Sequence, residues 1–129
     1  MSGIEPDSRT SIRTFNFSLA VTTYQYMEKI FELEKLISKL ECSESYFLTF
    51  LSSRGIDAGI LRLLPGEEDV QEPHPSDEIY LVMKGDGFIR INDRKYELKK
   101  NSFVYVPANV EHKFCENKEE LLVAYFLAS

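Results

Sequence analysis

The chain contains only two histidines, His74 and His112, and a carboxylate, Glu78, follows the first of them by four residues. Histidine is the side chain that most often binds transition metals or moves a proton near neutral pH. Two imidazoles and one carboxylate form a ligand set that leaves open positions on a divalent ion. Either histidine could instead be a structural imidazole held by hydrogen bonds, so residue types alone leave both interpretations open.

The spacing of these residues suggests a shared environment. Side chains along a β-strand alternate between its two faces, so a strand through residues 72–78 would place Glu72, His74 and Glu78 on one face. If that face points into a barrel, burial of the carboxylates is costly unless they are paired or bound to a cation. A metal ion would be the simplest compensation.

The elements that must position these groups are mostly strands. Short runs rich in aromatic and β-branched residues alternate with glycine, proline, asparagine and aspartate, which predicts an all-β barrel or sandwich. The predicted strands cover residues 46–52, 56–64, 79–84, 88–92, 95–98, 102–106 and 121–127.

The N-terminal third of the chain has a different pattern. Apolar residues recur every three or four positions over residues 23–40, which predicts an amphipathic helix. Mixed charge on its polar face favours packing on the domain's own sheet over a membrane or a partner helix. Residues 1–13 have too few apolar side chains to bury, which predicts a mobile tail, whereas apolar and other side chains alternate over residues 14–21 as they do along a strand.

Composition excludes several classes of protein. A chain of 129 residues is the size of one domain, and its formal charge of −6 disfavours nucleic acid as a partner. We find no run of about 20 apolar residues for a membrane span and no secretory signal, so a cytoplasmic protein is expected. Cys42 and Cys115 form neither a disulfide framework nor a metal knuckle.

Residues 66–85 resemble the first motif of the cupin family, whose small β-barrels carry metal ligands in two short motifs. That motif has a glycine, five residues, two histidines separated by one residue, a glutamate three or four residues later, and a glycine after six more. Here Gly66, Glu72, His74, Glu78 and Gly85 occupy these positions. Glu72 thus stands where the first metal histidine normally falls.

Residues 101–116 resemble the second cupin motif, which runs from a glycine through proline, glycine and histidine to an asparagine. Here Asn101, Pro107, Asn109, His112 and Glu116 occupy these positions. Asparagine is the non-glycine residue that most readily adopts positive φ, so we expect both turns to survive. Glu116 replaces the final asparagine, and we expect its carboxylate to be solvated.

The resemblance implies a single cupin double-stranded β-helix, or jelly-roll barrel, over residues 22–129, with the helix of residues 23–40 in front. It implies a metal site of His74, Glu78 and His112, with Glu72 as a candidate fourth ligand. The ion would be iron, manganese, nickel, cobalt or zinc. Cupins usually pair their barrels and often exchange N-terminal strands, which implies a homodimer in which residues 1–21 supply the tail and the exchanged strand.

The function implied by the resemblance is that of a metal-binding cupin that acts on or binds a small organic molecule, as an oxygenase, an isomerase or a lyase. Alternatives are a non-catalytic small-ligand-binding cupin with structural or absent metal, and a stress or storage protein held together by its dimer. With both histidines as ligands, proton transfer would fall to Glu72, Glu116, a tyrosine or metal-bound hydroxide. The expected aromatic mouth of the barrel comprises Tyr80, Met83, Phe103, Tyr105, Phe114, Tyr125 and Phe50.

Overall fold

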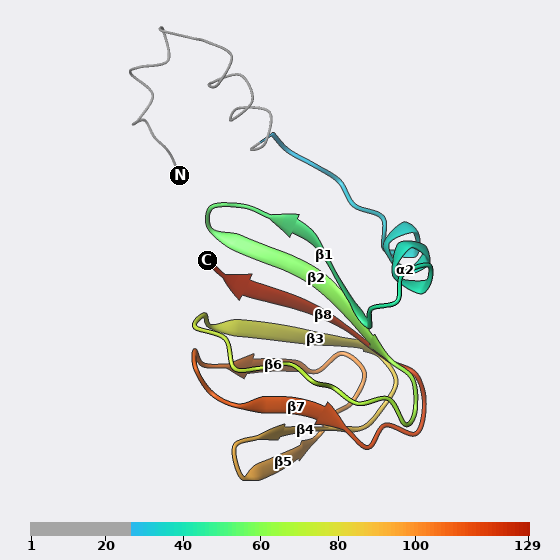
Figure 1. Ribbon diagram of the computed structural model, residues 1–129, viewed down its shortest axis with the longest axis vertical. Helices are drawn as coiled ribbons and strands as arrows, with labels where there is room; N and C mark the ends of the chain where they lie inside the picture. Colours follow the sequence, from blue (N-terminus) through green and yellow to red (C-terminus); the bar gives the residue numbers. More distant parts are fainter. Residues whose placement is uncertain (1–26) are drawn as a thin grey trace, which may run out of the picture. The chain divides into compact units, whose positions relative to one another are not determined.

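The computed structural model describes residues 27–129, of which Phe31–Ser129 form one compact unit of eight strands and a short helix (Figure 1). Antiparallel pairing joins the strands into a five-stranded sheet, ordered β1-β2-β8-β3-β6, and a three-stranded sheet, ordered β5-β4-β7. The strands are β1 (Phe47–Ser52), β2 (Ile56–Leu63), β3 (Glu78–Lys84), β4 (Phe88–Ile91), β5 (Arg94–Glu97), β6 (Phe103–Val106), β7 (His112–Cys115) and β8 (Leu121–Ala128).

The core lies on the inner face of the larger sheet, against side chains from the smaller one. Alternation along each strand sends every second side chain inward, as Tyr80 and Val82 of β3 show with 1% and 0% exposure. Ile89 of β4 and Phe114 of β7 complete this core from the three-stranded sheet. The prediction of an all-β jelly-roll barrel with one preceding helix is confirmed.

Seven of the eight strands correspond to runs recognised in the sequence. The exception is β7, the short segment His112–Cys115 that carries one of the two histidines. Its four residues include one aromatic and no β-branched side chain, so strand propensity gives little signal there. Pairing with β4, from Phe88↔Cys115 to Ile91↔His112, fixes it as a strand.

The helix is shorter than predicted. In the described residues, α2 covers Leu33–Glu41, whereas residues 27–32 are not helical although the prediction placed the helix over residues 23–40. Buried Leu36 and Leu40 pack against Ile60 of β2. Because short helices gain most of their stability from packing an apolar face, the helix is confined to the turns whose apolar side chains are buried.

The connection between β2 and β3 also differs from the prediction. Residues 64–77 contain no strand, so Glu72 and His74 are not on a strand that continues into β3. Pro73 and Pro75 flank His74; each lacks a backbone N–H and restricts the residue before it, which opposes sheet pairing. His74 is therefore positioned by a loop, and the predicted strand alternation does not apply to residues 72–77.

The turns of the second motif form as expected. Asn101 and Asn109 have φ values of 72° and 65°, the left-handed region that a glycine would otherwise occupy. The backbone N–H of Asn109 donates to the carbonyl oxygen of His74 at 2.6 Å. This hydrogen bond ties the loop carrying the first motif to the turn that precedes His112.

The tail and the strand predicted over residues 1–21 lie outside the described residues, so strand exchange and the homodimer stay predictions. None of the helices in residues 27–129 is long and apolar enough to cross a membrane.

Candidate metal and small-molecule site

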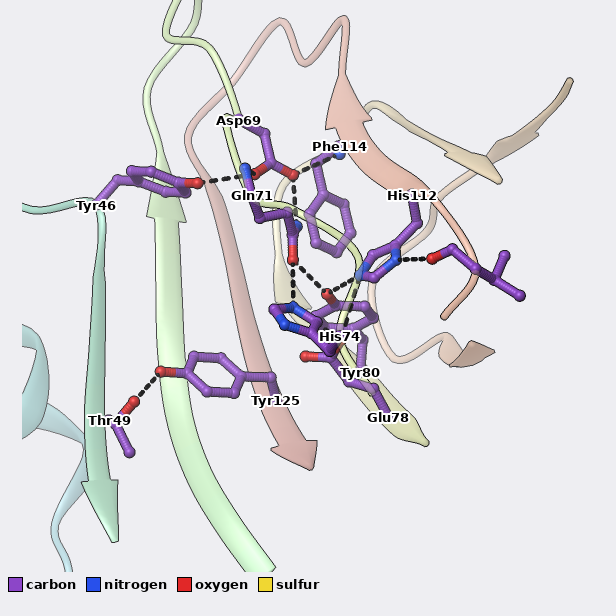
Figure 2. Close-up of polar contacts among 11 residues, drawn as sticks. Tyr46, Thr49, Asp69, Gln71, His74, Glu78, Tyr80, His112, Phe114 and Tyr125 are labelled. Carbon is purple, nitrogen blue, oxygen red and sulfur yellow. Dashed lines mark hydrogen bonds and ion pairs between the residues drawn. The ribbon is translucent and has the colours of Figure 1, made fainter. Parts of the chain in front are cut away.

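The structure brings together three of the four predicted metal ligands: His74 from the β2–β3 loop, Glu78 from the start of β3, and His112 from the start of β7 (Figure 2). One ligand atom from each lies within 4.8 Å of the others. Oε1 of Glu78 is 3.2 Å from Nε2 of His112 and 3.8 Å from Nε2 of His74. The cluster therefore has the size and donor types of a site for one divalent ion.

Glu78 gives the strongest sign that a cation fits here. Its side chain is 3% exposed, and Oε1 is buried without any hydrogen-bond partner. A buried carboxylate oxygen without a partner is costly, and a metal ion between it and two imidazoles would remove that cost. The side chain of His74 remains 32% exposed, which leaves the cluster open on that side.

His112 presents one defined nitrogen to the cluster. Its Nδ1 lies 2.9 Å from the carbonyl oxygen of Val110, and because a carbonyl only accepts, Nδ1 carries the hydrogen. Nε2 of the neutral imidazole is thus the acceptor that faces Glu78. Burial favours the neutral ring, but interaction of the protonated ring with the Glu78 carboxylate and with the Val110 carbonyl outweighs it and raises the pKa of His112.

Tyr80 lies beside the cluster, and its role follows from this geometry. Its hydroxyl is 2.9 Å from Nε2 of His112 and 3.2 Å from Oε1 of Gln71. Burial and the negative charge of Glu78 raise the pKa of Tyr80 far above its usual value, so the hydroxyl keeps its proton in the metal-free protein. Tyr80 is therefore a proton-carrying group in contact with a candidate metal ligand.

A cavity of about 310 Å³ opens beside the cluster, enough for a small organic molecule. Three aromatic rings besides Tyr80 contribute to its wall. Its lining residues are Tyr46, Phe47, Thr49, Leu61, Val70, Gln71, Glu72, His74, Glu78, Tyr80, Tyr125 and Leu127. Only Tyr80 and Tyr125 of the predicted aromatic mouth belong to this wall.

Strand alternation explains why the other residues predicted for the aromatic mouth do not line the cavity. Phe103 and Tyr105 of β6 point outward and are 74% and 58% exposed. Met83 and Phe50 pack on the outer face of the sheet, against the cluster that includes α2. Phe114 is buried behind Tyr80, with ring centroids 4.8 Å apart. Tyr46 and Phe47 were missed because they precede or begin β1, where residue type alone does not reveal the inward face.

Tyr125 lies flat across the sheet over a glycine. Register places Gly59 of β2 between Thr49 of β1 and Tyr125 of β8, and the Tyr125 hydroxyl lies 2.6 Å from Oγ1 of Thr49. A Cβ at Gly59 would overlap the Tyr125 ring. The glycine therefore makes the space in which this aromatic side chain lies along the cavity wall.

Two acidic residues considered at the sequence level lie apart from the cluster. Glu72 lines the cavity but is exposed and does not join the three converging ligands, so direct ligation by Glu72 stays a prediction. Glu116 pairs with Lys95 at 2.9 Å and is half exposed, in line with the solvated role expected for it. The next residue, Asn117, is buried and donates to the carbonyl oxygen of Leu63 at 3.0 Å.

A polar pair, buried Asp69 and half-buried Gln71, was not found from the sequence. Asp69 is 2% exposed, and its Oδ2 accepts from Nε2 of Gln71 at 2.7 Å. Gln71 in turn reaches both His74 and Tyr80 (Figure 2). No motif marks these residues, because their importance depends on the path of an irregular loop.

Comparison with known proteins agrees with these features. The family model described as "Cupin domain" matches residues 59–128. An uncharacterised protein of Streptomyces coelicolor is 36% identical over 95 residues, which cover 74% of this chain and 90% of that protein. Dimethylsulfoniopropionate lyase DddW of Ruegeria pomeroyi is 30% identical over 81 residues, covering 63% of this chain and 53% of the lyase.

Solved structures show the same fold at lower sequence identity. An RmlC-like cupin with a double-stranded β-helix fold from Methanocaldococcus jannaschii superposes with a TM-score of 0.65 at 19% identity, covering 79% of this chain and 91% of that one. The TT1209 protein of Thermus thermophilus gives a TM-score of 0.66 at 20% identity, with 78% and 97% covered. Because the family model matches more than half of the chain, residues 59–128, the chain belongs to the cupin superfamily.

Proposed function

We propose that this chain is a divalent-metal-dependent enzyme that moves a proton on a small organic acid, as a lyase or an isomerase does. His74, Glu78 and His112 would hold the ion. The observation that carries the proposal is the Tyr80 hydroxyl, 2.9 Å from Nε2 of His112 at the wall of a cavity. A group that can give and take a proton thus lies beside the ligand cluster, where no free histidine remains for that task.

The lining of the cavity supports binding of an organic acid through the ion. None of the described lining residues is lysine or arginine, whereas Glu72 and Glu78 are acidic. A divalent cation would supply the positive charge for a substrate carboxylate and would polarise the bonds next to it. The aromatic walls would enclose the rest of the molecule and exclude water from it.

Tyr80 is the residue that would exchange the proton. In the metal-free protein its hydroxyl is a donor, because its pKa is raised. A cation near the oxygen favours the phenolate. Once its own hydrogen has passed to water in the cavity, the Tyr80 oxygen could accept a proton from a substrate carbon and later return it, while the rest of the side chain stays fixed by its contact with Phe114.

One relative supports this type of reaction. Dimethylsulfoniopropionate lyase DddW shares 30% identity with this chain over 81 residues. A lyase reaction on a small organic acid is therefore the form of the proposal to test first, with dimethylsulfoniopropionate as one substrate in a wider panel.

The test combines metal content with turnover. We expect purified protein to bind one equivalent of iron, manganese, nickel, cobalt or zinc, and Tyr80→Phe to keep the metal while lowering turnover about 10²-fold or more. Tyr105→Phe, an exposed tyrosine on the outer face, is the matched control and should keep full activity.

Absence of metal binding would overturn the proposal, as would full turnover by Tyr80→Phe. One equivalent of tightly bound metal without turnover of any panel member would instead favour the non-catalytic ligand-binding cupin.

A further inference from the structure

We propose that Asp69 and Gln71 act as a positioning pair that fixes the imidazole tautomer of His74 and offers a second acceptor to the Tyr80 hydroxyl. The inference deepens the metal site proposed above, but it concerns the metal-free protein and can be tested without turnover. It rests on hydrogen bonds whose donor and acceptor roles follow from the groups themselves.

Asp69 is held rigidly by four donors. Its carboxylate is 2% exposed and accepts from the hydroxyl of Tyr46 and the backbone N–H of Phe114, both at 2.8 Å. It also accepts from the backbone N–H of Gln71 at 3.2 Å and from Nε2 of Gln71 at 2.7 Å. A carboxylate with this many donors around it has no freedom to turn toward another partner.

The bond to Asp69 fixes which end of the Gln71 amide faces the site. The two ends of a glutamine amide differ, because the NH₂ donates and the oxygen accepts. The carboxylate can pair only with the NH₂, so Oε1 of Gln71 must face away from Asp69. Oε1 lies 3.2 Å from both Nε2 of His74 and the hydroxyl of Tyr80.

The amide oxygen then determines where the neutral His74 ring carries its hydrogen. Because Oε1 only accepts, the hydrogen is on Nε2 of His74. The ring of His112 has the opposite tautomer, since the Val110 carbonyl holds the hydrogen on its Nδ1. In the metal-free protein each histidine of the cluster thus has one N–H held by a protein oxygen, which fixes the orientation of the ring. For His74 this N–H is on the nitrogen that lies 3.8 Å from Oε1 of Glu78, so an ion that binds through Nε2 would have to replace this hydrogen and its bond to Gln71.

Tyr80 gains an alternative partner from the same oxygen. Its single hydrogen can point to Nε2 of His112 at 2.9 Å or to Oε1 of Gln71 at 3.2 Å. As long as Tyr80 keeps its hydrogen, an ion that takes the lone pair of His112 Nε2 leaves Oε1 of Gln71 as the acceptor. Asp69 therefore acts on Tyr80 and His74 without touching either of them.

The presence of only two histidines makes a direct test practical. We would record long-range ¹H–¹⁵N spectra of the full, untagged, metal-free chain at about pH 9, well above the usual histidine pKa of about 6.5. His74 should show a hydrogen-bearing Nε2, and His112 a hydrogen-bearing Nδ1. The two rings should therefore give opposite patterns.

Gln71→Leu removes the acceptor but leaves the bonds of Asp69 to Tyr46 and Phe114 available. We expect the two nitrogen shifts of His74 to move toward an average of both tautomers, while those of His112 stay unchanged. Asp69→Asn should have the same effect on His74, because it removes the carboxylate that orients the amide. If this variant fails to fold, Gln71→Leu still tests whether the Gln71 oxygen fixes the tautomer of His74.

The matched control is Asp86→Asn, which alters a partly buried carboxylate that also accepts from backbone N–H groups, those of Lys118 and Glu119. Both histidine patterns should be unchanged in it. A His74 ring with its hydrogen on Nδ1 in the wild type would overturn the inference, and so would a Gln71→Leu spectrum identical to wild type. Neither outcome depends on whether the chain binds metal or turns over a substrate.

Discussion

The two faces of β3 reverse the usual distribution of polar and apolar side chains. On the inner face, Glu78 and Tyr80 are 3% and 1% exposed, whereas on the outer face Ile79 is 45% exposed. Its register partner Tyr105 is 58% exposed, and nearby Phe103 is 74% exposed. A buried charge and an exposed apolar patch both carry a cost that a second molecule or ion can remove. The inner face is suited to a cation, and the outer face to a protein surface.

The largest effect is expected on the inner face, from Glu78→Gln. Loss of a residue that hydrogen-bonds to a metal ligand commonly lowers metal affinity about 10- to 100-fold. Loss of a direct ligand should lower the affinity by more. Calorimetric zinc titration measures this change. Glu97→Gln, an exposed glutamate on β5, is the control and should bind as wild type does. Unchanged affinity in Glu78→Gln would mean that a cation is not the reason for the burial of this carboxylate.

Substitutions on the outer face should affect formation of the dimer. The predicted homodimer of 14.9 kDa chains would cover the exposed aromatic side chains of β6. If it does, Phe103→Glu should raise the dimer dissociation constant about 10-fold or more, because buried aromatic residues dominate interface energy. Deletion of residues 1–21 should also weaken the dimer. Light scattering that finds a monomer of the wild type at micromolar concentration would contradict the prediction.

Alkaline pH should destabilise the folded protein through Tyr46, whose hydroxyl donates to Asp69. Burial, and to a smaller extent the hydrogen bond to Asp69, raise the pKa of Tyr46 to about 12. In the unfolded chain a tyrosine has a pKa of about 10. Between about pH 10 and 12 the unfolded state loses this proton while the folded state keeps it, so the free energy of unfolding should fall as pH rises.

Urea unfolding at several pH values across this range measures the fall. Tyr46→Phe should make it shallower, whereas Tyr105→Phe on the outer face serves as the reference substitution. An equal pH dependence in both variants would mean that Tyr46 does not account for any part of the fall.

The smallest effect is expected at Glu72. Because its side chain is exposed and outside the ligand cluster, Glu72→Gln should change zinc affinity by less than about 3-fold, unless the loop brings the carboxylate to the ion. A loss comparable to that of Glu78→Gln would establish Glu72 as a fourth ligand. It would also show that the loop moves when metal binds.

The sequence was informative where a signal is local. Strand runs, the turns at Asn101 and Asn109, and the spacing of His74, Glu78 and His112 all depend on residue type and short separations. Strand alternation could not be applied correctly to residues 72–77, because two prolines break the strand that the prediction assumed. The roles of Asp69 and Gln71 depend on contacts across the barrel, for which no short-range pattern exists.

Gly59 has a consequence for which molecules the cavity can accept. Since the Tyr125 ring occupies the space above a residue without a side chain, any larger residue at position 59 would have to push that ring into the cavity and also displace the backbone oxygen of Leu48 in β1. Ligand size is therefore limited by a residue that contributes nothing to the wall itself. Relatives with alanine or valine at this position should select smaller molecules even if every lining side chain is the same, so specificity in such barrels cannot be compared from the lining alone.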